Sequence, residues 1–245
     1  MPVYVLLLLA ATPSTLGLDG GMSLDATRWG PHQNPAALAL GRSYLYMGGV
    51  YRQLGHDGYT LGFGAVDATS GPVAGSLGLL IQQPDGGVVV DSGFGLLLSP
   101  QLAAGLAFVK PNTDRSDWSD LSARTGALLL QGPMRFGIHY DFSATALANP
   151  WTFSALYQQR LGHFSLGVDV QNDLSSRLAL LFSSERFRLE LAGQLSSERS
   201  VRSYGAAIDY LEKGGWLGLA YRRDLEDNSQ FLGFRFAAQL RRHAP

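Results

Sequence analysis

The chain has 245 residues and a formal net charge of −1; 16% of its residues are charged, 46% are hydrophobic and 30 are glycine. This charged fraction is below the roughly 25% of soluble domains, while the glycine content is high for a helical protein and the apolar content is high for a disordered one. The charge balance excludes an electrostatic nucleic-acid-binding surface, and the absence of cysteine excludes disulfides, thiolate zinc sites and thiol nucleophiles.

The N-terminus is predicted to be a signal peptide over residues 1–17. Residues 3–11 form an apolar run, small residues follow it, and the run is far shorter than the roughly 20 residues that a membrane helix requires. No Lys or Arg precedes the run, and the first basic residue is Arg28. The alternative is that the run is the buried first strand of a soluble domain.

From residue 41 onward the dominant pattern is an alternation of period two, broken by turn residues. In the stretch 134–142, "MRFGIHYDF", Phe136 and Ile138 share one face, and Arg135, Gly137 and His139 share the other. Such alternation indicates β-strands, and its regular interruption indicates an all-β barrel or sandwich. We expect about fourteen strands, with twelve as the alternative count. They begin near residues 42, 58, 72, 87, 101, 120, 133, 150, 162, 175, 186, 200, 214 and 229.

The connections between these strands are sorted by length. Those after odd-numbered strands include residues 110–120, 143–150, 171–176 and 224–229, whereas those after even-numbered strands include the tight turns 99–101, 131–133, 161–162 and 184–186. Long connections at one end and short ones at the other are typical of a transmembrane β-barrel of the outer membrane. A soluble sandwich has no reason to sort its connections in this way.

The apolar faces fit the same architecture, since a membrane barrel points apolar side chains to lipid and keeps its lumen small or polar. Tyr140 and Phe142 end one strand, and Trp151 and Phe153 begin the next. All four rings are expected to face outward at one rim, as in an aromatic girdle. The competing interpretation places these rings in the core of a soluble sandwich, but the opposite faces are too rich in glycine and alanine for an ordinary solvated surface.

Residues 24–48 contain Asn34-Pro35-Ala36, a short apolar stretch, and a strand that opens with Gly-Arg-Ser. This region resembles the start of FadL-like and PorV-type outer-membrane barrels. The resemblance implies a fourteen-stranded barrel over residues 41–241 with a short N-terminal lumen plug over residues 18–40. It places Asn34 and Pro35 at the junction of plug and barrel. Fatty-acid transport is implied only as an option, because the connections here are too short for the ligand-capturing groove of that group.

The size of the barrel also calls for a plug. About fourteen strands enclose a lumen wider than their own side chains fill, since eight strands already suffice for a filled interior. The segment before the first strand carries Trp29, Pro31 and Pro35 and a run of alanine and leucine, so it can pack in a lumen. Trp29 is therefore a predicted plug residue, and the resemblance adds Asn34 and Pro35 at the junction.

Several polar residues are expected to face the lumen. They are Arg135, His139, Asp141, Arg160, His163, Asp169, Arg188, Glu190 and Arg235. Arg135, Arg160, His163 and Arg188 would lie near the periplasmic mouth, where they could form a basic ring that holds an anionic group such as Asp19, Asp25 or a passing carboxylate. The alternative is mutual neutralisation with lumen acids such as Glu190.

No catalytic or metal-binding motif occurs: the five histidines lack metal-ligand spacing, and nucleophile elbow, Walker and Rossmann patterns are missing. We therefore expect no enzyme, no cofactor and no nucleic-acid partner. The predicted function is a bacterial outer-membrane channel or binding barrel for a small hydrophobic molecule, with outer-membrane lipid as its surroundings. The alternatives are a barrel that holds or escorts partner envelope proteins, and a soluble protein of eight to ten strands.

Overall fold

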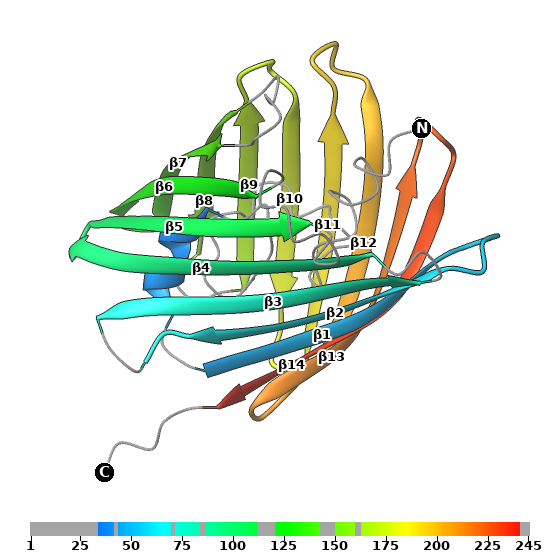
Figure 1. Cartoon of the computed structure of the whole chain (residues 1–245), viewed down its shortest axis with the longest axis horizontal. Helices are drawn as coiled ribbons and strands as arrows, with labels where there is room; N and C mark the ends of the chain where they lie inside the picture. Colours follow the sequence, from blue (N-terminus) through cyan, green and yellow to red (C-terminus); the bar gives the residue numbers. More distant parts are fainter. Residues whose placement is uncertain are drawn as a thin grey trace.

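The computed structural model describes residues 34–41, 44–69, 72–83, 87–111, 121–142, 150–159 and 163–240. They form a closed barrel of fourteen antiparallel strands, in which each strand pairs with its neighbours in sequence and β1 (Tyr44–Gln53) pairs with β14 (Gln230–Leu240). Figure 1 shows β2 to β5 crossing the front of the barrel at a steep angle to β9 to β12 behind them. A 3₁₀ helix, η1 (Pro35–Leu40), precedes the barrel, and no helix of the described residues is long and apolar enough to cross a membrane.

The strands begin one or two residues after the expected positions, which confirms the count of fourteen. The remaining strands are β2 (Tyr59–Asp67), β3 (Val73–Gln83), β4 (Val88–Ser99), β5 (Leu102–Pro111), β6 (Ser122–Gln131), β7 (Met134–Phe142), β8 (Trp151–Gln158), β9 (Phe164–Gln171), β10 (Ser176–Ser183), β11 (Phe187–Leu195), β12 (Val201–Glu212) and β13 (Gly215–Asp224).

The two ends of the barrel differ in the length of their connections. The longest ones, residues 112–121 and 143–150, follow β5 and β7, whereas β4, β6 and β12 are followed by the tight turns 100–101, 132–133 and 213–214. We call these the long-loop end and the short-turn end. The sorting is not perfect, because residues 68–72 and 159–163 lie at the short-turn end and are as long as several connections opposite. The chain enters β1 and leaves β14 at the short-turn end.

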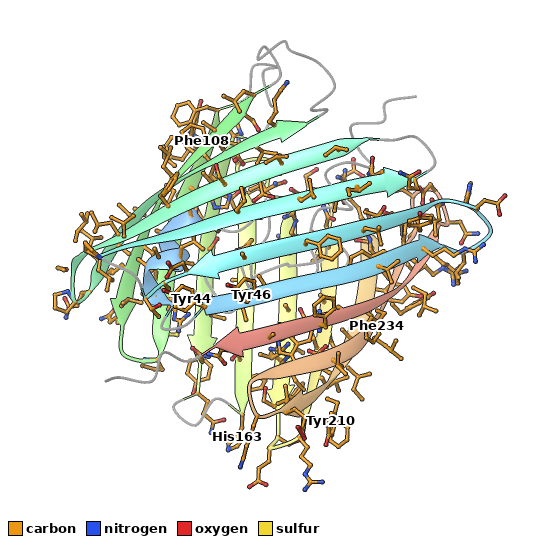
Figure 2. The ribbon with its side chains drawn as sticks, turned by 60° about the horizontal axis from the view of Figure 1, so that its bottom comes forward. Tyr44, Tyr46, Phe108, His163, Tyr210 and Phe234 are labelled. Atoms are coloured by element: carbon orange, nitrogen blue, oxygen red, sulfur yellow. The ribbon has the colours of Figure 1, made fainter. Side chains whose placement is uncertain are left out.

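The alternation of each strand separates an apolar exterior from a small or polar interior. On β1, Tyr46 and Val50 are exposed, whereas Leu45, Met47 and Tyr51 are buried toward the lumen. Figure 2 shows Tyr46 and Phe234 on the outward face of β1 and β14. Phe136 and Leu166 are exposed on other strands, as the sequence predicts for lipid-facing positions. A closed barrel satisfies its backbone hydrogen bonds internally and has no free edge, so this exterior suits a bilayer.

Aromatic rings gather near both ends of this exterior. At the long-loop end, Tyr140 contacts Phe142 and Trp151 with ring centroids 4.5 and 4.6 Å apart, which confirms the predicted girdle. At the short-turn end, Phe187 packs against Tyr210 with centroids 5.5 Å apart. Two aromatic rims bounding an apolar band are the mark of a transmembrane barrel. The described residues therefore form a transmembrane β-barrel of the outer-membrane type.

Candidate functional site

The helix η1 lies inside the barrel against β4, β5 and β6. Asn34 caps its N-terminus: its Oδ1 accepts a hydrogen bond from the Ala36 backbone N–H at 3.0 Å, and Pro35 follows at the first helical position. Asparagine before proline is a favourable start for a helix, because the side chain satisfies a free N–H and proline has none to satisfy. The Asn-Pro-Ala sequence thus builds a compact turn that fits in a lumen.

The same asparagine also fastens this turn to the wall. Its Nδ2 donates hydrogen bonds to the backbone carbonyls of Ala127 on β6 and Ile138 on β7, both at 3.1 Å. Ala127 and Ile138 face each other in the register of these strands. Asn34 is fully buried, and both ends of its amide have partners. One side chain therefore shapes η1 and ties it to the barrel, at the position predicted for the plug junction.

The inner wall beneath η1 is built from glycine. A Cβ on Gly105 would overlap the backbone of Pro35 and Ala36, and a Cβ on Gly126 would overlap the Asn34 side chain. A Cβ on Gly95 would lie 2.7 Å from the Ala39 backbone nitrogen. These positions on β4, β5 and β6 let η1 approach the backbone of the sheet closely. We call Gly95, Gly105 and Gly126 the plug seat.

Apolar side chains close around η1. Ala36 and Ala37 are buried together with Leu128, Leu156 and neighbouring alanines of the inner wall. Leu38 packs on a second cluster that includes Leu45, Met47 and Val66. The buried apolar residues of these two clusters are thus in contact with η1 or with each other.

The inner wall of β11 to β14 is different, because charged side chains cover it. Asp209 on β12 accepts hydrogen bonds from Arg188 on β11 at 2.7 Å and from Arg235 on β14 at 2.8 and 2.9 Å. Arg235 also donates to Glu190 at 3.3 Å. Arg235, Glu190 and Asp209 are about 1% exposed or less. We call Arg188, Glu190, Asp209 and Arg235 the ion cluster.

A glycine makes the central contact of the ion cluster possible. Asp209 and Arg235 lie on β12 and β14, so their interaction crosses β13, where Gly218 occupies the intervening position. A Cβ on Gly218 would overlap the Asp209 carboxylate. The Trp216 ring lies beside the two arginines, with the guanidinium carbons of Arg188 and Arg235 4.8 and 5.3 Å from its centroid. Cation–π contacts of this kind add to the fixed geometry of the cluster.

Charges also line the inner wall toward the long-loop end. Arg124 on β6 forms an ion pair with Asp141 on β7, and His139 Nε2 lies 4.0 Å from Asp141. On β13 the Arg222 guanidinium donates to Asp224 at 2.7 Å. Arg177 on β10 faces Asp169 on β9 in the register of the strands. This half of the lumen therefore presents both signs of charge on several strands.

The predicted lumen residues occupy different places. His139, Asp141, Asp169, Glu190 and Arg235 lie on the inner face of their strands, as do Arg135 and Arg188. Arg135 donates to the Gln158 side chain at 2.7 Å. Trp29 and Arg160 lie outside the described residues, as do the predicted signal peptide and residues 18–33 of the predicted plug.

The structure does not place His163 in the lumen, because β9 begins at Phe164 and His163 belongs to the connection before it. It is exposed, its Nδ1 lies 3.0 Å from the Ser183 carbonyl oxygen, and Figure 2 shows it at the edge of the barrel. Among the described members of the predicted basic ring, Arg188 pairs with Asp209, whereas Arg135 contacts an amide. Arg188 thus has an acidic partner within the wall, Asp209, in keeping with the neutralisation alternative.

The sequence pattern does not single out Asp209, Arg222, Arg124 or Gly218. Asp209 could still be assigned to the lumen, because it falls on the same face of β12 as Gly205 and Ala207, whose side chains are too small for a lipid-facing surface. Its partner cannot be found in this way, since the contact crosses a strand. Among the described residues, no group of three or more His, Asp or Glu side chains is arranged to hold a metal ion.

Comparison with solved structures gives the same fold. The chain is similar to the outer membrane protein Omp33 of Acinetobacter baumannii with a TM-score of 0.60 and 12% identity, over 82% of this chain and 100% of that one. It is similar to a mutant of the Rh. blastica porin with a TM-score of 0.51 and 10% identity, over 81% and 99% of the two chains. No protein-family model matches the sequence, and no curated protein matches it. At these identities the likeness shows a shared porin-like barrel fold.

Proposed function

We propose that this outer-membrane barrel is a narrow channel for small polar solutes, in which η1 reduces the open cross-section of the lumen. The observation that carries this proposal is the charged inner wall near the long-loop end, where Arg124 on β6 and Asp141 on β7 are partly exposed beside the buried pair Arg222 and Asp224 of β13. Polar solutes and water exchange hydrogen bonds with such a lining, whereas an apolar lining would leave them without partners.

The position of η1 favours a restricted channel rather than a wide pore. Its residues Ala36 and Ala37 are fully buried, and the glycines of the plug seat give it a close fit to the wall. A barrel of this strand number without such a filling would leave a larger passage. The predicted plug over residues 18–40 is part of this proposal, with η1 as its described portion.

A second candidate is transport of a hydrophobic molecule, as in the FadL-like group. The geometry of Asn34, Pro35 and Ala36 favours a plugged barrel of that general kind. Against it, the described apolar residues of the lumen pack on η1 or on each other, so they offer little surface to a hydrophobic substrate while η1 is in place. The third candidate, a scaffold for partner envelope proteins, requires no passage at all.

The test is reconstitution of the full chain in planar bilayers and in liposomes. We expect small ion conductance, together with uptake of a pentose or a small amino acid and not of a medium-chain fatty acid. The variant Arg124→Gln removes the cationic partner of Asp141, so the reversal potential in a salt gradient should move toward cation selectivity, while Arg186→Gln in an exposed turn should leave it unchanged.

Each alternative has its own outcome. Fatty-acid uptake without sugar uptake would overturn the polar channel in favour of the second candidate. A folded protein that neither conducts nor takes up any of these probes, and that purifies with another envelope protein in equal amounts, would favour the scaffold.

A further inference from the structure

The lipid-facing strand residues carry opposite charges at the two ends of the barrel. Near the long-loop end the outward-facing strand residues include Arg52 on β1, Lys110 on β5, Arg202 on β12 and Arg223 on β13. Near the short-turn end the charged ones are Asp67 on β2 and Glu212 on β12, with no Lys or Arg among the described outward strand positions. The apolar band is common to both ends, so it does not explain this difference in charge.

Three of the cations lie on the same outer surface at the long-loop end, two of them on the neighbouring strands β12 and β13 and the third on β1, beyond β14. Arg52 of β1 lies opposite Leu232 of β14. Leu232 in turn lies opposite Tyr221 of β13, and Arg223 is two residues after Tyr221. Arg223 faces Tyr204 of β12, and Arg202 is two residues from Tyr204. Arg202 and Arg223 are therefore diagonal neighbours on adjacent strands, about 7–8 Å apart, whereas Arg52 lies one strand further along the rim, across β14. We call Arg52, Arg202 and Arg223 the arginine rim.

The present partners of the arginine rim are exposed and weak. Arg52 has a side chain 63% exposed and lies 3.9 Å from the fully exposed carboxylate of Asp57. Arg202, 42% exposed, pairs with the loop residue Glu226 at 2.9 Å, and Arg223 donates to the Asn228 amide at 2.8 Å. Exposed ion pairs of this kind contribute little to stability, so the arginines are not explained as a structural device.

The surroundings of the rim define the depth at which it lies. Leu232, Val50 and Tyr59 are exposed beside or below the arginines on the same outer surface. Tyrosines among such apolar residues occupy the headgroup level of a membrane. A guanidinium at this level meets phosphate groups, which it binds through two parallel hydrogen bonds.

We infer that the arginine rim is a binding site for the phosphate groups of a phosphorylated glycolipid, the lipopolysaccharide of the outer leaflet. Longer connections face the cell exterior in barrels of this type, so the rim lies in the leaflet that contains this lipid. Charge complementarity favours this lipid as the ligand, because its anionic phosphates match the cationic long-loop end. The acidic strand residues of the short-turn end face the opposite leaflet. The inference does not depend on what passes through the lumen.

The experiment is a binding titration of the folded full chain in detergent with rough-type lipopolysaccharide that retains both phosphates of its lipid anchor. The double variant Arg52→Gln/Arg223→Gln should bind this lipid about fivefold more weakly for each arginine removed. Arg52→Lys/Arg223→Lys keeps the charge and should retain part of the affinity. Arg186→Gln/Lys213→Gln removes two cations from turns of the short-turn end and should bind as the natural chain does.

Two lipid controls complete the design. The dephosphorylated glycolipid should bind equally to the natural chain and to the double glutamine variant, because the substitutions remove only the interaction with phosphate. Faster migration of unheated samples on a gel verifies that each variant is folded. Unchanged binding of the phosphorylated lipid to the folded double glutamine variant would overturn the inference, as would equal, arginine-dependent binding of phosphatidylglycerol.

Discussion

The lumen is filled in different ways at two parts of the inner wall. One is the plug seat on β4 to β6, and the other is the wall of β11 to β14. Both contain small residues, with Gly95, Gly105 and Gly126 on one and Gly205 and Gly218 on the other. The plug seat is covered by η1, a segment that comes before the barrel in the chain. The other wall is covered by its own side chains, among them Arg235 and Trp216.

We propose that η1 is a movable filling of the lumen and that the ion cluster is a fixed one. Two hydrogen bonds from Asn34 and close apolar packing hold η1 on the wall, so η1 can leave without breaking a strand pair. The ion cluster links β11, β12 and β14, and removal of one member leaves a buried charge without its partner. We therefore expect changes in the plug seat to alter conductance first and changes in the ion cluster to alter stability first.

The largest expected effect is that of Asp209→Ala. It leaves Arg188 and the fully buried Arg235 without their shared carboxylate, which should lower the free energy of unfolding by about 3–5 kcal/mol, because an unpaired buried charge is costly. Conductance should stay close to that of the natural chain. Urea unfolding in lipid vesicles and planar bilayers measure the two quantities. A matched double variant, Asp209→Ala/Arg235→Met, should recover part of the stability, and no recovery would show that the cluster acts by packing alone.

Gly105→Val tests the other wall. Its side chain would occupy the place of the Pro35 and Ala36 backbone, so η1 must move away, at an overpacking cost of about 1–3 kcal/mol. Single-channel conductance should rise several-fold, since the displaced segment no longer narrows the lumen. A variant that folds and conducts no better than the natural chain would contradict a plug at this wall.

Asn34→Ala is a milder change at the same wall. It removes the helix cap and both hydrogen bonds to β6 and β7 but introduces no overlap, so the cost should be about 1–2 kcal/mol. We expect more frequent open events of the same conductance, because η1 is loosened and not expelled. Asn34→Asp keeps the cap but not the two donated hydrogen bonds, and an equal effect of both substitutions would show that the bonds to the wall are the ones that matter.

The smallest effect is expected for Gly193→Ala. The added Cβ would lie 3.7 Å from the Ser203 carbonyl oxygen, which is ordinary contact distance, and the position is on neither inner wall. Stability should stay within about 0.5 kcal/mol and conductance should not change. A larger shift in either quantity would mean that glycine substitutions disturb this barrel generally, and Gly105→Val would then need a different control.

The outward faces and the strand starts can be predicted because both depend on local pattern. Phe136 and Trp151 stand out by alternation alone, and every strand begins within two residues of the expected position. His163 lies just before β9, because the alternation continues past the residue at which the strand starts, and a period of two does not mark that residue. Alternation does not reveal the arginine rim either, because Arg52, Arg202 and Arg223 are far apart in sequence and share one surface only through the pairing of β12, β13, β14 and β1.

The sequence by itself determined the membrane barrel, its strand count and its lipid-facing surface, since these follow from alternation and connection length. Only the tertiary structure decided which side chains or segments cover each part of the inner wall. Asp209 reaches Arg235 across β13 because Gly218 leaves room, and η1 lies on β4 to β6 because three glycines from separate strands line up beneath it. Such contacts depend on the register of several strands at once, and register is fixed by the closed sheet, not by any one segment.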